Sequence, residues 1–256
     1  MTHFMIVMLI VTGVALLIAI GYLNNVVESN KVTKTRTQHE LKDRLRRCLE
    51  ISETFPGQLM TPALKLLMAR LEQNLCQRQL KLDKRNESAK QRLVELEAEI
   101  AKGDAIEVSN PPVPIMTEEK AKDVRFLLEA LHAQVTRAAQ EEFLPAGEAR
   151  HWIREIRHIL VLLHIEFFNN LGQELLSQDQ PGQARLAFER GVHYLRNLAE
   201  PQVYEEQLKY LEKMLKRTNS IVLTNLEPAA DEVNELTEGL KADESESQWK
   251  KKVIYD

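Results

Sequence analysis

The hydrophobic residues of this chain form three patterns along its length. Residues 4–23 are one apolar run in which no side chain carries a charge. From residue 37 to about 226, apolar residues recur every three or four positions, the spacing that gathers them on one face of an α-helix. After residue 228, apolar residues become rare and acidic ones frequent. We therefore expect an all-α protein with a membrane helix, a helical body and a disordered tail.

The first run is long enough to cross a bilayer. At about 1.5 Å per residue, a helix over 4–23 spans roughly 30 Å, the thickness of the hydrocarbon core. The short N-terminus, 1–3, has no Lys or Arg, whereas the juxtamembrane stem, 24–36, is basic. Because basic residues favour the cytoplasmic side, we predict a single-pass protein of a bacterial inner membrane, with its N-terminus outside and its body in the cytosol.

Two points about this segment stay open. The stem residues Lys31, Lys34 and Arg36 either contact anionic lipid headgroups or only set the orientation of the span. The apolar run itself has a cleaved signal peptide as its alternative, with a small-x-small site at 19–21. The length of the run and the lack of a basic residue before it favour the anchor.

Residues 37–102 have the pattern of a helical stalk or hairpin. Thr37 to Glu40 fits a capping box at a helix start, and Thr61 before a proline fits a second start. A polar stretch around Asn86 interrupts the later apolar stripe, so this part is either one long helix or two. The stripes would be buried in an antiparallel hairpin or in a coiled coil between copies of the chain.

A Pro-rich linker over 103–117 separates this stalk from a distal helical domain over 118–227. Thr117 is the expected N-cap of the first distal helix. The most apolar stretch outside the membrane run, 159–168, predicts a central helix packed on several sides, in which His164 is a buried, hydrogen-bonded core residue.

Residues 165–198 carry a pattern of large and small residues around a Pro-Gly turn. Gly, Ala and Gly allow two helices to approach closely, and two Phe fill the space between them. This stretch resembles one tetratricopeptide repeat, which implies an α-solenoid-like domain that binds partner peptides in a groove. The positions that carry the resemblance are Phe168, Leu171, Gly172, Ala184, Phe188 and Gly191.

The acidic tail, 228–256, ends in a basic and aromatic motif. Aromatic and aliphatic anchors at the tip of a flexible tail are typical of a docking motif, and a frayed end without a partner is the alternative. The motif residues are Trp249, Lys250, Lys251, Lys252, Ile254 and Tyr255.

Composition and motifs exclude several classes of function. The net charge of −4 argues against a dedicated nucleic-acid binder. The sequence has no phosphate-binding glycine motif, nucleophile elbow or paired CxxC, so we expect no catalytic residues and no cofactor. The two cysteines, Cys48 and Cys76, are expected to be reduced and partly buried.

Three Glu-x-x-His pairs have the spacing found in di-iron helical bundles. A helical wheel places Trp152 and Ile156 on the buried face of their helix and His151 and His158 nearly opposite them, toward solvent. A charged, solvent-exposed outer face is therefore favoured over a metal site. The three pairs are Glu129 and His132, Glu148 and His151, and Glu155 and His158.

The sequence favours a non-enzymatic, membrane-anchored adaptor or scaffold that binds one or more proteins or peptides. A self-associating envelope or cell-division protein, joined through the stalk as a homo-oligomer, is the first alternative. A di-metal oxidoreductase is the second.

Overall fold

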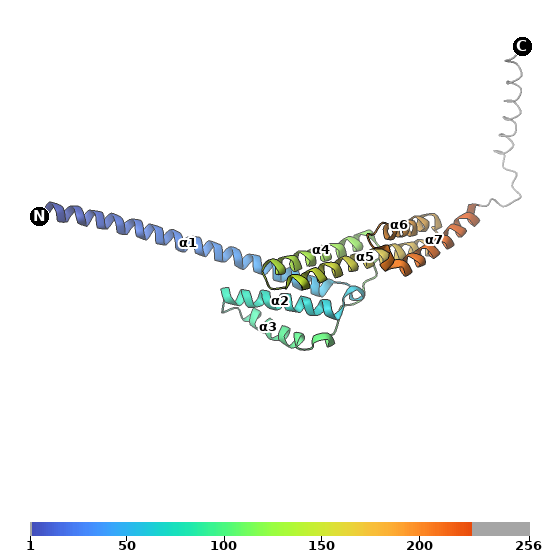
Figure 1. Ribbon diagram of the computed structural model, residues 1–256, viewed down its shortest axis with the longest axis horizontal. Helices are drawn as coiled ribbons and strands as arrows, with labels where there is room; N and C mark the ends of the chain where they lie inside the picture. The colour runs from blue at the N-terminus through green and yellow to red at the C-terminus, as the bar shows by residue number, and fades with distance from the viewer. Residues whose placement is uncertain (1, 227–256) are drawn as a thin grey trace, which may run out of the picture. The chain divides into compact units, whose positions relative to one another are not determined.

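The computed structural model describes the backbone of residues 2–226 and the side chains of that range except 2–7, 9–11, 14–16 and 225–226. The described chain is mostly helical and contains no strand, which confirms the all-α fold. It divides into two compact units, unit 1 (Met1–Phe167) and unit 2 (Phe168–Asp256). The α-helices are α1 (Thr2–Thr54), α2 (Pro62–Leu82), α3 (Glu87–Ile100), α4 (Glu118–Gln140), α5 (Ala146–Ser177), α6 (Pro181–Arg196) and α7 (Glu205–Leu226) (Figure 1). Short 3-10 helices lie at Gly57–Leu59, Gly103–Ala105 and Pro201–Tyr204.

α1 is one continuous helix, and the helix start expected at Thr37 is wrong. The Thr37 hydroxyl donates a hydrogen bond to the Thr33 carbonyl at 2.9 Å, inside the helix, instead of capping a new one. The stem, 24–36, has no glycine or proline that would end a helix, so the helix continues through it. All side chains from Leu17 to Arg36 are exposed.

None of the helices in the described part of the chain has a stretch that is both long and apolar enough to cross a membrane. Many side chains of the run predicted to span, 4–23, lie outside the described residues.

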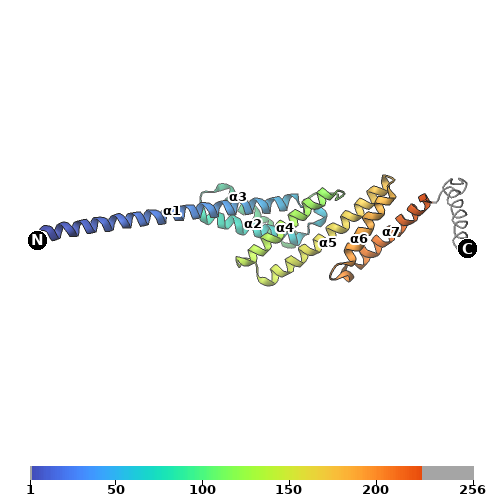
Figure 2. The same cartoon turned by 90° about the horizontal axis from the view of Figure 1, so that it is seen from above.

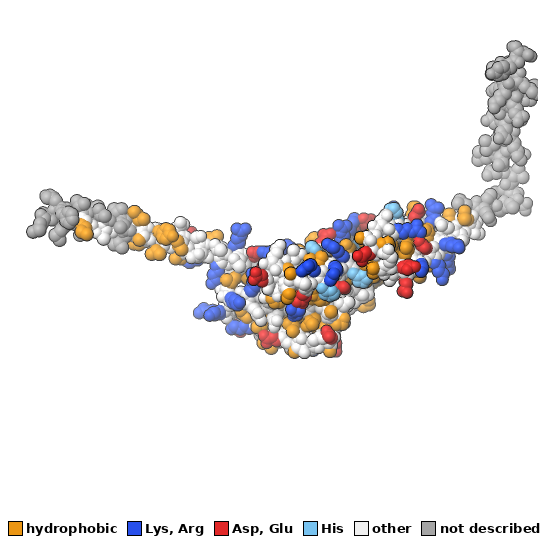
Figure 3. All heavy atoms as spheres, viewed as in Figure 1, with side chains coloured by type: hydrophobic (Ala, Val, Ile, Leu, Met, Phe, Trp, Pro, Cys, Tyr) orange, Lys and Arg blue, Asp and Glu red, His pale blue; other side chains and the backbone are white. Residues whose placement is uncertain are grey.

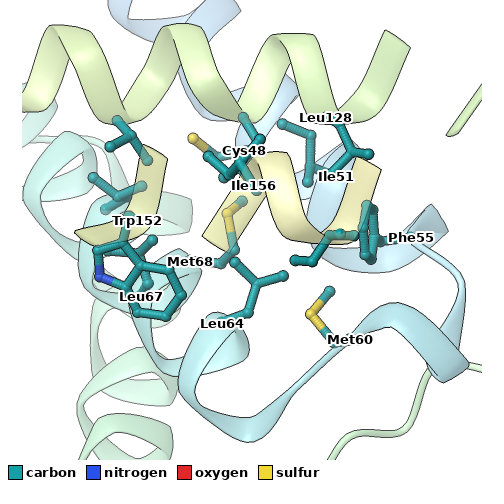
Figure 4. Close-up of a cluster of buried hydrophobic side chains, with 14 of the residues drawn as sticks. Cys48, Ile51, Phe55, Met60, Leu64, Leu67, Met68, Leu128, Trp152 and Ile156 are labelled. Carbon is teal, nitrogen blue, oxygen red and sulfur yellow. The ribbon is translucent and has the colours of Figure 1, made fainter. Parts of the chain in front are cut away.

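The core of unit 1 is formed by α1, α2, α4 and α5. Figure 4 shows residues of all four helices pointing toward one another, with Ile51 of α1 and Leu128 of α4 each 2 % exposed. The apolar stripes predicted for 37–82 are therefore buried within this core. Its largest fully buried members include Ile51, Phe55, Leu64, Leu67, Met68, Leu128, Leu131 and Leu163.

α2 and α3 form an antiparallel hairpin, which resolves the alternative left open around Asn86. The Thr61 hydroxyl accepts a hydrogen bond from Leu64 N at 3.1 Å, as expected of an N-cap. Asn86 Oδ1 caps α3 in the same way by accepting from Ala89 N at 3.1 Å. The buried Glu72 of α2 accepts from Arg92 of α3, with Arg92 Nε 2.6 Å from Glu72 Oε1. Arg92 Nη2 also donates to Glu72 Oε2 at 3.1 Å, and this two-oxygen contact is geometrically specific and fixes the two helices together.

The segment 103–117, expected to be a spacer, packs against the end of α1. Asn110 Nδ2 donates to the carbonyls of Ser52 and Phe55, each at 2.9 Å, and so satisfies acceptors that a helix end leaves open. Gly57 N donates to the Pro111 carbonyl at 3.0 Å, and a β-carbon on Gly57 would overlap the Asn110 carbonyl. The division between the compact units falls after Phe167 instead of within this segment.

α4 and α5 lie side by side (Figure 1 and Figure 2). The Thr117 hydroxyl accepts from Lys120 N at 3.3 Å, which confirms the expected N-cap of α4. At the other end, Glu142 adopts a positive φ of 59°. His164 is hydrogen-bonded as expected, with Nδ1 2.7 Å from the Leu160 carbonyl, but it is only partly buried.

Candidate protein-binding grooves

Unit 2 is built from the last part of α5 together with α6 and α7. Its core side chains are almost completely removed from solvent, because small residues let the helices approach closely. A β-carbon on Gly172 of α5 would overlap the ring of Phe188 on α6. A β-carbon on Gly191 would lie 3.0 Å from both Phe168 Cβ and Leu211 Cδ1. Leu171, the remaining large residue of the repeat-like pattern, is half-buried.

The turn between α5 and α6 is closed by backbone hydrogen bonds. Gln180 N donates to the Leu175 carbonyl at 2.9 Å and Asp179 N to the Leu176 carbonyl at 3.2 Å. Asp179 itself has a φ of 56°, in the left-handed region. These are the features of a Schellman motif, which ends α5 and turns the chain back for α6, whose first residue is Pro181.

An apolar groove runs along α6, with a volume of about 760 Å³. The half-buried rings of Phe168 and Tyr194 line it, with centroids 6.4 Å apart. Leu186, which also lines it, is exposed by 46 %. Burial raises the pKa of the Tyr194 hydroxyl, and the neighbouring Tyr204 adds to the shift. The α6 groove is lined by Phe168, Leu186, Glu189, Arg190, His193, Tyr194, Asn197 and Leu198.

A second groove, of about 570 Å³, lies between the end of α5 and α7. Gln173 Nε2 of α5 donates to the Tyr210 hydroxyl of α7 at 3.3 Å, so the groove is bridged at one point. Tyr210 is nevertheless exposed by 45 %. The α5–α7 groove is lined by Gln173, Leu176, Asp179, Pro181, Tyr210, Met214, Arg217 and Ile221.

The Glu-x-x-His pairs do not converge. Glu148 is ion-paired with Arg70 at 2.6 Å and Glu129 with Arg125 at 2.9 Å. His132 and His151 are exposed, and Trp152 and Ile156 lie in the core as the helical wheel predicts. In the part of the chain that the structure describes, no group of three or more His, Cys, Asp or Glu is arranged to hold a metal ion.

Only some of the other predicted contact residues lie in the described part of the chain. Lys31, Lys34 and Arg36 are exposed on α1. The C-terminal motif, 249–255, lies outside the described residues. Sequence reasoning missed Leu186 and Tyr194 as lining residues of the α6 groove. The only signal for Leu186 was an apolar residue outside the buried stripe of its helix.

Geometry alone identifies these grooves. No protein-family model, curated protein or solved structure matches the chain. The resemblance of 165–198 to a tetratricopeptide repeat therefore stays a prediction.

Proposed function

We propose that the chain is a non-enzymatic adaptor, anchored in a membrane by residues 4–23, which binds an extended peptide segment of a partner protein in the α6 groove. The observation that carries this proposal is the combination of two half-buried aromatic rings with the exposed apolar side chain of Leu186 in one groove. Ligand-binding sites are typically concave and mostly apolar, with a few polar groups that fix the orientation of the ligand. Arg190 and Glu189 at this groove supply such polar groups.

The anchor rests on the sequence of the apolar run and on the basic stem that follows it. We place the body on the cytosolic side of a bacterial inner membrane. Confinement at the membrane raises the effective concentration of the adaptor near membrane-bound partners. The tail motif, with Trp249 and Tyr255 as its anchors, is a second contact in this proposal.

Burial of the apolar stripes within unit 1 supports the adaptor over the self-associating alternative. The stripes that a coiled coil would use, including Leu41 and Leu64, are buried inside unit 1. We therefore favour the adaptor over a stalk-mediated oligomer.

A photo-crosslinking experiment tests the adaptor proposal. A photoreactive amino acid is placed at Leu186 in the full chain, and a matched control carries it at Val94, which is exposed by 66 % in unit 1. We expect a discrete crosslinked partner from Leu186 only. Leu186→Glu should abolish co-purification of that partner from detergent extracts, whereas Val94→Glu should leave it unchanged. Equal recovery with both variants would contradict a binding site in the α6 groove.

A further inference from the structure

Folding brings the turn between α2 and α3 back toward the part of α1 that precedes Arg44. Because α2 runs antiparallel to α1, Lys65 at its start hydrogen-bonds to Ser52 near the end of α1, with Lys65 Nζ 2.9 Å from Ser52 Oγ. Near the other end of α2, Arg78 shares Glu141 with Arg44 of α1. The residues after Arg78 therefore lie level with the part of α1 that precedes Arg44.

This end of unit 1 is basic. The turn and the helix ends on either side of it carry four exposed cations, and α1 carries three more at 31–36, before Arg44 and about 50 residues away in the sequence. Figure 3 shows Lys and Arg side chains gathered at the end of unit 1 from which α1 emerges. This basic face consists of Lys31, Lys34, Arg36, Lys81, Lys84, Arg85 and Lys90.

Carboxylates near the basic face are largely engaged with cations. Glu87 is paired with Lys90 at 2.7 Å, Glu40 with Arg137, and Glu141 with Arg44 and Arg78. Asp83 accepts a hydrogen bond from the backbone of Arg85. Only one of the seven cations of the face, Lys90, takes part in these ion pairs.

The opposite end of unit 1 has the reverse charge. α3 ends there because it runs away from the α2–α3 turn, and α4 begins there because its C-cap, Glu141, contacts Arg44 and Arg78 near the basic face. Acidic residues outnumber Lys102, Lys120 and Lys122 at this end, so the unit has a basic pole and an acidic pole. The acidic residues are Glu97, Glu99, Asp104, Glu107, Glu118 and Glu119.

The geometry of α1 sets the height of the basic face above the proposed membrane span. At about 1.5 Å per residue, Lys31 lies roughly 12 Å and Arg36 roughly 20 Å beyond Leu23, the last residue of the span. The headgroup layer extends only about 5–8 Å beyond that boundary, so unit 1 must tilt for the higher cations of the face to reach it. A span tilted by about 20°, which is typical, would lower one side of unit 1 toward the lipid.

We propose that the basic face, including Lys81, Lys84 and Arg85 of the α2–α3 turn, docks on the anionic phospholipid headgroups of the leaflet from which α1 emerges. The inference rests on the membrane anchor of the proposed function and adds a second lipid contact, which holds unit 1 in one orientation. The acidic pole is then repelled by the same leaflet, so both poles favour that orientation.

Energy transfer between the turn and the lipid surface tests this docking. The full chain carries Gln91→Cys, an exposed position near the turn, labelled with a fluorescent donor; the native Cys48 and Cys76 are buried. It is reconstituted into vesicles of phosphatidylcholine alone, or of equal parts phosphatidylcholine and phosphatidylglycerol, with an acceptor dye on a trace of headgroup. We expect higher transfer with phosphatidylglycerol, and the increase should disappear at high salt because screening weakens exposed charges.

Two sets of substitutions with the same loss of charge separate docking from general electrostatics. Lys81→Gln, Lys84→Gln and Arg85→Gln together should remove most of the increase, whereas Lys102→Gln, Lys120→Gln and Lys122→Gln at the acidic pole should retain it. Equal transfer in both lipids, or equal loss with both sets, would overturn the docking.

Flotation with phosphatidylcholine vesicles tests the anchor separately. If the chain floats but energy transfer does not rise with phosphatidylglycerol, the anchor stands and the docking of the basic face is refuted. If the chain does not float with either kind of vesicle, both proposals are refuted.

Discussion

Arg44 donates a hydrogen bond to Glu141 at 2.7 Å, although the two residues are 97 positions apart in the sequence. Arg44 lies on α1 and is 7 % exposed, and Glu141 is the C-cap of α4. Glu141 also accepts from Arg78 of α2, so one carboxylate joins three helices of unit 1. Arg44 Nε donates in addition to Gln134 Oε1 at 3.2 Å.

Replacing this carboxylate should destabilise unit 1. Glu141→Gln leaves the buried Arg44 without its counter-charge, and we expect a loss of about 2–4 kcal/mol in the free energy of unfolding. Glu129→Gln is the control, because Glu129 makes an exposed pair with Arg125 and should change stability by no more than about 0.5 kcal/mol. Urea unfolding of both variants measures the difference. Equal effects would show that Glu141 has no special structural role.

The contribution of Glu141 should depend on pH. Partial burial opposes its charged form, but the hydrogen bonds and charges of Arg44 and Arg78 outweigh burial and hold the pKa below its usual value. A depressed carboxylate pKa stabilises the folded state above the unfolded pKa of about 4.3 and loses that effect as the pH falls through the folded pKa. The stability difference between the native chain and Glu141→Gln should therefore be constant near neutral pH and shrink below about pH 4. A difference that grows in acid would be inconsistent with this assignment.

The close approach at Gly172 should not tolerate a methyl group. Gly172→Ala forces the Phe188 ring to move within a core where that ring is fully buried, and we expect destabilisation by about 1–3 kcal/mol. Gly182→Ala is a matched control in the same unit, since open space surrounds that position in the first turn of α6. It should be neutral or stabilising by up to about 1 kcal/mol. Thermal unfolding of the two variants provides the comparison.

Both native thiols should be unreactive in the folded chain. Burial, followed by the charge of Glu72, raises the pKa of Cys48 to about 12 and that of Cys76 to about 11. Because the thiolate is the nucleophile, alkylation near pH 8 should proceed only after unfolding in urea. Gln91→Cys supplies an exposed thiol as the positive control. Rapid labelling of Cys48 or Cys76 in the native protein would contradict their burial.

Local signals in the sequence predict the structure more accurately than long-range ones. Thr61 and Thr117 cap the helices that they were predicted to cap, because a capping hydrogen bond involves only neighbouring residues. Thr37 has the same local signature, but nothing before it ends α1, so the helix continues. The Pro-rich segment is not a spacer, because a long-range contact holds it against α1. Asn110 finds its acceptors near Ser52, and no local pattern indicates a contact over that separation.

The candidate site shows the same division. The contact of Gly172 with Phe188 follows from the repeat-like pattern, because the two residues lie on consecutive helices joined by a tight turn. The α6 groove depends on where Leu186 and Tyr194 lie relative to Phe168 on another helix. The basic face likewise joins two segments that are distant in the sequence, and their proximity follows only from the packing of α2 on α1.

Because α1 is continuous, the number of residues between the proposed membrane span and unit 1 fixes the direction in which unit 1 faces around the helix axis. One residue inserted between Val26 and Val27 would turn unit 1 by about 100° around the helix axis and raise it by about 1.5 Å. Seven inserted residues would nearly restore the original direction while raising the unit by roughly 10 Å. Orientation and height above the bilayer are thus two quantities that insertions into the stem change independently.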